Sequence, residues 1–302
     1  IGYIIPTPVI RHFLKDIDTH GKYRGFCSLG LHWQTIENKG MKLALKMDSK
    51  PDVKSQGVLV RKVEPLSDTS QILQAFDVLM TFDGVPIASD GTVEFRDGER
   101  VCFSYLVTSK FVGDTAKITF KRNGKSMSDV VRLSTSIPLV RSHMYDKTTS
   151  YFIYGGIVFT QLSFPYLEAE FGKKWDKKAP IKLCDYAFFG MAHKKSDQVV
   201  ILNQVLISDV NIGYESFSNL RVYTVNDKKI SSLAELVKLI TSCKKKFVRI
   251  QLEQDHLIVI DTAQAMKTHN EILKQNNIPA EVSDDLKEHI AKSYAKNVTY
   301  KS

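Results

Sequence analysis

The feature that most constrains the fold is a weak internal repeat, in which one order of strands and turns recurs after about 142 residues. A buried strand, Val-Leu-Val at 58–60, follows Gly57, and Val-Ile-Leu at 200–202 repeats it. The Asp83-Gly84 turn has a counterpart at Asn226-Asp227. A chain of 302 residues is long enough for two domains. The repeat therefore predicts two copies of one small α+β domain.

Turn signals and helical periodicity define elements within each copy. Residues 117–122 and 126–133 flank Asn123-Gly124, and Asn-Gly favours the tight turn of a two-residue hairpin. Residues 220–225 are an expected strand of the second copy, and two more strands surround Gln254-Asp255.

Helices are expected over residues 9–18, 99–108 and 232–242, where apolar residues recur at helical spacing. The last of them begins with a Ser-x-x-Glu capping box at Ser232. Helical segments also alternate with a break in the tail, residues 263–302.

Composition excludes several classes of protein. Apolar residues make up 43% of the chain and charged residues 25%, which is typical of folded proteins and excludes disorder of the whole chain. No run approaches the roughly 18 consecutive apolar residues of a membrane span, so we expect no integral membrane protein. Residues 1–5 lack the basic segment of a signal peptide.

The cysteines and histidines predict neither a disulfide framework nor a metal site. No Cys-x-x-Cys pair and no His-x-x-x-His pair is present. The four cysteines are far apart, at Cys27, Cys102, Cys184 and Cys243. We therefore expect no metal, no cofactor and a reducing intracellular compartment.

The net charge of +9 is spread along the chain, with a dense lysine cluster between Lys173 and Lys182. An excess of Lys and Arg over Asp and Glu can indicate a nucleic-acid partner. An excess that is spread along the chain does not form the basic patch that binds nucleic acid. We expect no nucleic-acid partner and interpret the lysine cluster as a solvated face. A docking patch for an acidic protein is the alternative.

Catalytic motifs are missing from the sequence. No Ser is followed directly by Gly, so the Gly-x-Ser-x-Gly turn of a serine hydrolase is absent, and no Gly-rich phosphate loop is present. We therefore expect no catalytic site in this chain, with an unrecognised enzyme as a lesser alternative.

What remains is a pattern for binding. Residues 26–31, Phe-Cys-Ser-Leu-Gly-Leu, precede the strand-like residues 32–36. A strand with a free edge can accept an extended peptide as an added strand. A glycine in the preceding loop lets backbone N–H groups approach a peptide carboxylate.

These elements resemble the PDZ domains of the Deg/HtrA serine proteases. Ser-Leu-Gly-Leu at 28–31 is similar to the carboxylate-binding loop, and residues 57–65 are similar to the next strand. Residues 76–87 resemble the family's Gly-Asp-Val-Ile run and its Asn/Asp-Gly-x-x-Ile turn, although Phe76 stands where the family has Gly. In the second copy Asn226-Asp227 lacks the turn glycine.

Other stretches extend the resemblance. Residues 1–6 are similar to the last strand of the family's protease domain, and residues 91–96, 154–159 and 204–215 resemble its plant-type branch. The family's catalytic His, Asp and Ser lie before the point where this chain begins, so none of them is carried over. The resemblance implies a parent protein that is an ATP-independent serine endopeptidase, and a chain that is not itself an enzyme.

The resemblance also implies the architecture, an α+β fold of two tandem PDZ-like domains with a helical C-terminal tail. Each domain would be a small, partly open antiparallel β-barrel with flanking helices. The expected parts are the end of the protease domain with a linker helix (1–25), the first PDZ domain (26–135), a linker (136–150), the second PDZ-like domain (151–262) and the tail (263–302).

A peptide would lie between the strand after Leu29 and the helix over 99–108, with the amides of Leu29 and Gly30 facing its carboxylate. The candidate peptide-binding residues lie in the loop, the strand or the helix: Phe26, Cys27, Ser28, Leu29, Gly30, Leu31, Trp33, Val101, Tyr105 and Leu106. The three helix residues could equally belong to the core.

The function implied by the resemblance is recruitment of unfolded or damaged protein, or of C-terminal peptides, and assembly of a trimer-based homo-oligomer. One alternative is a purely structural module whose grooves are filled by its own segments, which the bulky Phe26 and Tyr154 would allow. Another is an adaptor without a protease domain. Plant-type relatives occur in plastids, mitochondria and nucleoli, so an organellar and a nuclear location both stay open.

Overall fold

The chain forms two compact units, Ile1–Ile137 (unit 1) and Pro138–Ser302 (unit 2). The computed structural model describes residues 4–47, 56–145, 147–291 and 294. Of residues 1–6, which are similar to a strand of the family's protease domain, residues 1–3 lie outside the described part of the chain and residues 4–6 form no strand.

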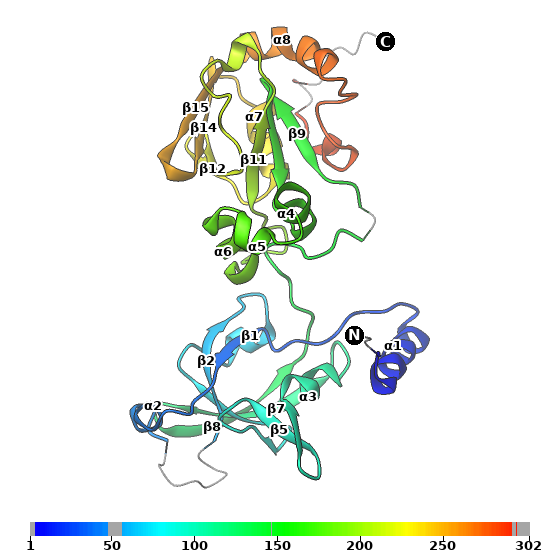
Figure 1. Ribbon diagram of the computed structural model, residues 1–302, viewed down its shortest axis with the longest axis vertical. Helices are drawn as coiled ribbons and strands as arrows, with labels where there is room; N and C mark the ends of the chain where they lie inside the picture. Colours follow the sequence, from blue (N-terminus) through cyan, green and yellow to red (C-terminus); the bar gives the residue numbers. More distant parts are fainter. Residues whose placement is uncertain (1–3, 48–55, 146, 292–293, 295–302) are drawn as a thin grey trace. The chain divides into compact units, whose positions relative to one another are not determined.

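Among its described residues, unit 1 contains one main antiparallel sheet and three helices (Figure 1). Its strands are β1 (Leu31–Gln34), β2 (Val58–Val63), β3 (Val78–Phe82), β4 (Val85–Pro86), β5 (Thr92–Arg96), β6 (Glu99–Cys102), β7 (Thr115–Arg122) and β8 (Lys125–Arg132). Its helices are α1 (Thr7–His20), α2 (Lys39–Ala44) and α3 (Ser104–Thr108), with a 3-10 turn, η2 (Asp68–Gln71). The sheet order is β1-β2-β3-β7-β8, with β4 paired to β3, and β5 and β6 form a separate hairpin.

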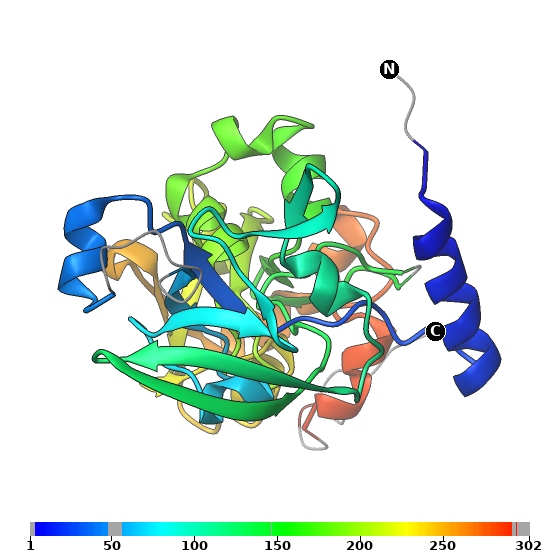
Figure 2. The same cartoon turned by 90° about the horizontal axis from the view of Figure 1, so that it is seen from below.

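The β7–β8 hairpin forms where the Asn-Gly signal predicts it (Figure 2). Asn123 and Gly124 have φ angles of 51° and 85°, the left-handed conformation that this turn requires. Every second residue of β7 faces inward, so that Ala116, Ile118 and Phe120 are buried in the core of unit 1.

The prediction of a helix over residues 99–108 is wrong for its first half. Residues Glu99–Cys102 form β6, which pairs with β5 across a turn in which Gly98 has a φ of 76°. This pairing places Val101 opposite Val93, whose side chain is fully buried. Strand pairing therefore prevails over the helical spacing, and α3 begins only at Ser104.

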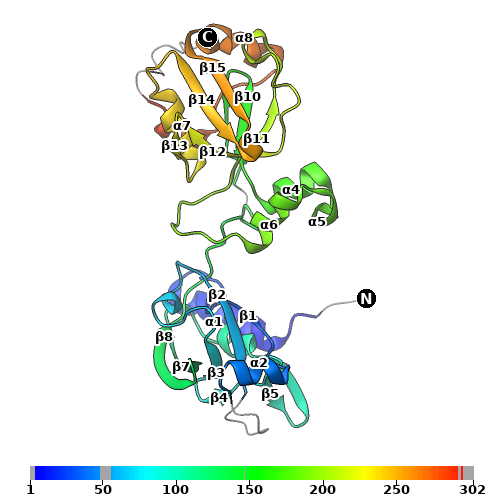
Figure 3. The same cartoon turned by 90° about the vertical axis from the view of Figure 1, so that its left-hand side faces the viewer.

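Unit 2 contains a larger antiparallel sheet and five helices among its described residues (Figure 3). Its strands are β9 (Tyr151–Tyr154), β10 (Ile157–Gln161), β11 (Val200–Val205), β12 (Leu220–Val225), β13 (Lys228–Lys229), β14 (Phe247–Leu252) and β15 (Leu257–Asp261). Its helices are α4 (Phe164–Phe171), α5 (Trp175–Lys178), α6 (Ile181–Phe189), α7 (Leu233–Thr241) and α8 (Thr262–Gln275), with 3-10 turns η3 (Asp209–Asn211), η4 (Glu253–Asp255) and η5 (Asp284–His289). The sheet order is β15-β14-β12-β11-β10-β9, with β13 paired to β12.

The two sheets confirm the internal repeat. The order β1-β2-β3-β7-β8 in unit 1 corresponds to β10-β11-β12-β14-β15 in unit 2, and a two-residue strand pairs with β3 and with β12. β2 begins at Val58 and β11 begins at Val200, 142 residues later. The helix that precedes the last two strands is α3 in unit 1 and α7 in unit 2.

The helix predicted over 232–242 is confirmed as α7. The Ser232 hydroxyl accepts a hydrogen bond from the Glu235 N–H at 3.2 Å, which caps the helix. The apolar residues of one face are all buried: Leu233, Leu236, Val237 and Ile240. In a full capping box the Glu235 carboxylate would accept from the N–H of Ser232. Here it accepts from the N–H and the hydroxyl of Ser231 instead.

Helices α4, α5 and α6 lie between β10 and β11 in the sequence and are grouped together (Figure 3). They pack around a small core of their own: Val140, Leu162, Leu167, Ala179, Leu183, Val199 and Ile201. Every lysine of the cluster between Lys173 and Lys182 is exposed. Among the described residues, no helix is both long and apolar enough to span a membrane.

Candidate functional site

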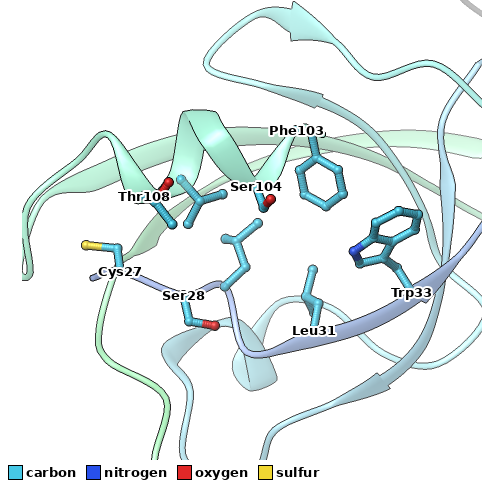
Figure 4. Close-up of a pocket in the computed structure, with 9 residues that line it drawn as sticks. Cys27, Ser28, Leu31, Trp33, Phe103, Ser104 and Thr108 are labelled. Carbon is cyan, nitrogen blue, oxygen red and sulfur yellow. The ribbon is translucent and has the colours of Figure 1, made fainter. Parts of the chain in front are cut away.

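A pocket of about 240 Å³ lies between β1 and α3 in unit 1 (Figure 4). β1 is an edge strand, because β2 is its only partner among the described strands. The pocket is lined by residues of the loop before β1, of β1 and of the α3 segment: Cys27, Ser28, Leu29, Leu31, Trp33, Phe103, Ser104, Val107 and Thr108. A strand edge beside such a pocket can accept an added strand, with one of its side chains in the pocket.

The walls of the pocket are apolar, and its polar side chains are mostly hydroxyls. The rings of Trp33 and Phe103 lie 5.3 Å apart and close one side (Figure 4). The hydroxyls belong to Ser28, Ser104 and Thr108, and none of the lining residues carries a charge. The pocket therefore suits an uncharged, apolar side chain.

Cys27 lies in the pocket lining as a neutral thiol. Its Sγ donates to the carbonyl oxygen of Lys110 at 3.3 Å. Burial raises the pKa of the Cys27 thiol to about 11. Because the thiolate is the reactive form of cysteine, Cys27 behaves at neutral pH as a small apolar residue rather than as a nucleophile.

Gly30 determines the shape of the loop before β1. Its φ is 62°, and a Cβ added to it would lie 2.5 Å from the Cβ of Ser67. Only glycine fits this position without a shift of the neighbouring chain. The Gly30 N–H donates to Oγ of Ser28 at 2.9 Å, and its carbonyl oxygen accepts from the Glu64 N–H at 2.7 Å.

The structure places six of the residues proposed from the sequence in this loop and strand. Five of them line the pocket: Cys27, Ser28, Leu29, Leu31 and Trp33. Gly30 lies in the loop between them.

The other four lie outside the pocket lining. Phe26 packs against α1. Val101 belongs to β6 and Leu106 packs against the core of unit 1. Tyr105 is 40% exposed and contacts the ring of Phe95.

Sequence reasoning missed the α3 side of the pocket, which is formed by Phe103, Ser104, Val107 and Thr108. The Asp97-Gly98 turn signal could have found it. If this turn joins two strands, the second strand ends near residue 102 and the helix begins after it. A helix that begins there turns different side chains toward β1.

In unit 2 the corresponding strand edge is occupied. β10 pairs with β11 on one side and with β9 on the other, whereas β1 has one partner among the described strands. Gly155 and Gly156, with φ angles of 55° and 80°, form the turn of the β9–β10 hairpin. Phe152 and Tyr154 of β9 are buried in the same core as α7, and burial raises the pKa of Tyr154 to about 12.

The far edge of β9 is covered as well. The Ile153 N–H donates to the carbonyl oxygen of Glu281 at 2.7 Å, and the Ser283 N–H donates to that of Tyr151 at 3.1 Å. The segment after α8 therefore extends the sheet beyond β9. The place where a peptide would add to β10 is filled by the chain itself.

Among the comparisons with known proteins, a family model covers part of unit 2, and relatives cover nearly the whole chain. A family model described as PDZ domain matches residues 140–285. The chain is 38% identical to the putative protease Do-like 3, mitochondrial, of Arabidopsis thaliana over 95% of this chain and 48% of that protein. It is 39% identical to the protease Do-like 2, chloroplastic, of the same plant over 95% of this chain and 46% of that protein.

This chain is a tandem PDZ region of the Do-like (Deg/HtrA) protease family. It spans about half the length of the curated relatives it matches, 48% and 46% of the two named above. A serine protease DegP homolog of Plasmodium falciparum is 25% identical over 81% of this chain and 38% of that protein. A solved structure described as HtrA-type protease AlgW with decapeptide matches 43% of this chain and 35% of that chain, at 21% identity and a TM-score of 0.31.

Proposed function

We propose that unit 1 of this Do-like PDZ region binds extended peptide segments as an added strand on β1. One apolar side chain of the peptide would enter the pocket between β1 and α3. The observation that carries the proposal is an edge strand beside an apolar pocket of about 240 Å³. We expect micromolar affinity, on the order of −8 kcal/mol, because main-chain hydrogen bonds and one pocket supply most of the binding energy.

The test is fluorescence polarisation of the full chain with a panel of labelled heptapeptides that end in Val, Leu, Ile or Phe. The variant Ser104→Trp should abolish binding, because the exposed Ser104 lines the pocket and an indole would fill it. The control is Ser109→Trp, an exposed position on the same segment outside the pocket lining. If no peptide binds, or if both variants bind like the parent chain, the proposal is wrong.

The second candidate function is assembly, and we infer it for unit 2. The filled edge of β10 argues against peptide capture by this unit. Exposed apolar side chains on α6, Ile181 (79%), Phe188 (47%) and Phe189 (57%), supply a contact surface for other subunits. The proposed product is a trimer-based homo-oligomer.

Multi-angle light scattering tests this assembly function. The double variant Phe188→Ser and Phe189→Ser should lower the mass of the chain in solution, whereas the control Phe247→Ser, an exposed site on β14, should not. A parent chain that is already monomeric, or a double variant of unchanged mass, would contradict the assembly function.

For the whole protein we propose an ATP-independent serine endopeptidase of protein quality control in an organelle. Support comes from the relatives, which are named as mitochondrial or chloroplastic proteases, and none of those named supports the nuclear alternative. The coding sequence upstream of Ile1 tests the chemistry, because a Gly-Asn-Ser-Gly-Gly run is expected there. Imaging of the fluorescently tagged whole protein tests the compartment.

A further inference from the structure

The loop before β1 has features that oppose a free peptide carboxylate. We propose that the pocket of unit 1 takes internal segments of extended chains, and that Ser28 selects against C-terminal carboxylates. This inference rests on the proposed peptide binding by unit 1. It departs from the expectation that Ser-Leu-Gly-Leu at 28–31 serves as a carboxylate-binding loop.

The first feature is that the Gly30 N–H already has a hydrogen-bond partner. It donates to Oγ of Ser28 at 2.9 Å. The backbone of Ser28 is itself anchored, because its N–H donates to the carbonyl oxygen of Ser134 at 2.9 Å (Figure 4 shows Ser28 beside the pocket). The hydroxyl is therefore held beside the loop amide, and a carboxylate would have to displace it.

The second feature is a negative charge behind the loop. The Glu64 N–H donates to the Gly30 carbonyl oxygen, and the Glu64 carboxylate accepts from Oγ of Ser136 at 2.8 and 3.0 Å. The Cβ of Glu64 lies only 3.2 Å from where a Cβ on Gly30 would be. A second carboxylate at the loop would be repelled by the first.

The third feature is that the cations around this end of the pocket are already paired. Lys110 lies beside Cys27, whose Sγ donates to the Lys110 carbonyl oxygen, and Arg24 precedes Cys27 by three residues in the chain. Arg24 pairs with Asp16 at 2.8 Å, and Lys110 pairs with Asp83 at 2.6 Å. With no charged residue in the pocket lining, a peptide carboxylate would meet no unpaired cation there. A chain that continues past the pocket carries no such charge into it.

The ligand class that follows is an uncharged, apolar stretch inside an unfolded chain. Calorimetry of the full chain with three forms of each heptapeptide in the panel tests this class. The forms are the free acid, the C-terminal amide and the peptide extended by Gly-Ser-Gly-Ser. We expect the free acid to bind about threefold or more weakly than the other two forms, because its carboxylate has to displace the Ser28 hydroxyl.

Equal or tighter binding of the free acid would overturn the inference while leaving the proposed peptide binding intact. Failure of all three forms to bind would instead overturn the proposed function, and the inference with it. The two failures are therefore distinguishable in one experiment.

The role of Ser28 is tested by Ser28→Ala and Ser28→Gly, both of which remove the hydroxyl. Each variant should raise the affinity for the free acid relative to that for the amide by about threefold or more, because the Gly30 N–H becomes available. The control is Ser109→Ala, whose hydroxyl donates to the Tyr105 carbonyl oxygen away from the pocket lining. If the variants change the affinities for the free acid and the amide equally, Ser28 does not discriminate against the carboxylate.

Discussion

Phe76 adopts a backbone conformation that its own side chain disfavours. Its φ is 72°, and 72% of the residue is exposed. The Phe76 N–H nevertheless donates to the Val60 carbonyl oxygen at 2.8 Å, so the turn before Asp77 forms as it would with the family's glycine. The left-handed conformation costs a residue with a Cβ about 1–2 kcal/mol.

We therefore predict that Phe76→Gly raises the free energy of unfolding of unit 1 by about 0.5–1 kcal/mol. Relief of the strain exceeds the extra flexibility that glycine gives to the unfolded chain, which costs at most about 1 kcal/mol. Urea denaturation followed by Trp33 fluorescence, in a Trp175→Phe background, measures the change.

The matched control for this prediction is Phe76→Ala, which removes the exposed ring but keeps the Cβ and so the strain. Phe76→Ala should not raise the free energy of unfolding of unit 1 by a comparable amount. If alanine stabilises unit 1 as much as glycine does, the exposed ring and not the backbone is the source of the effect.

At the scale of elements, one buried carboxylate helps to join α1 to the body of unit 1, together with the ring of His12, which stacks on Phe26 and Phe111. The side chain of Asp16 accepts from the Arg24 N–H at 2.6 Å and from Nε of Arg24 at 2.9 Å. His20 lies 3.2 Å away. The hydrogen bond from the Arg24 backbone is the main cause that holds the pKa of Asp16 below its usual 3.8.

This shift predicts a pH dependence. Because the folded state favours the ionised carboxyl, its contribution to stability is present above the unfolded pKa of 3.8 and is lost as the pH falls below it. Asp16→Asn should lower the melting temperature at pH 7, and the difference from the parent chain should shrink toward pH 3. Thermal melts followed by circular dichroism measure this, with the exposed Asp18→Asn as the control. A difference that stays constant with pH would contradict the assignment.

β9 fills in unit 2 the strand edge that β1 leaves available in unit 1. Its Phe152 is fully buried in the core of unit 2. We predict that Phe152→Ala destabilises unit 2 by about 3 kcal/mol or more, through lost burial and the cavity left behind. Guanidinium denaturation followed by Trp175 fluorescence, in a Trp33→Phe background, measures the loss.

The control for β9 is Phe247→Ala, since Phe247 is 42% exposed on β14. We expect Phe247→Ala to lower the free energy of unfolding of unit 2 by less than about 1 kcal/mol, as is usual for surface positions. Equal losses at the two positions would mean that β9 is not part of the unit 2 core.

At the scale of the whole molecule, each unit has its own sheet and its own core. Independent cores predict independent folding. A fragment of residues 1–137 should keep the amide NMR shifts that unit 1 has in the full chain and should bind the same peptides. Collapse of its spectrum to that of an unfolded chain would show that unit 2 is needed for folding.

The sequence by itself determined the repeat, the Asn-Gly hairpin, α7 and the loop before β1. Each of these features is specified by residues that are close together in the chain. The 3.6-residue and two-residue periods and the φ preferences of Asn and Gly act locally, so they can be recognised without knowing any distant contact.

The tertiary structure alone decided which residues line the pocket and which unit keeps a strand edge available. The start of α3 depends on the pairing of β6 with β5, and the filled edge in unit 2 depends on β9 pairing with β10 while residues 281–283 cover it. Whether a strand edge is filled depends on which partner supplies its hydrogen bonds. In unit 2 part of that partner lies about 130 residues away along the chain, as for the Ser283 N–H and Tyr151. No local pattern encodes that choice.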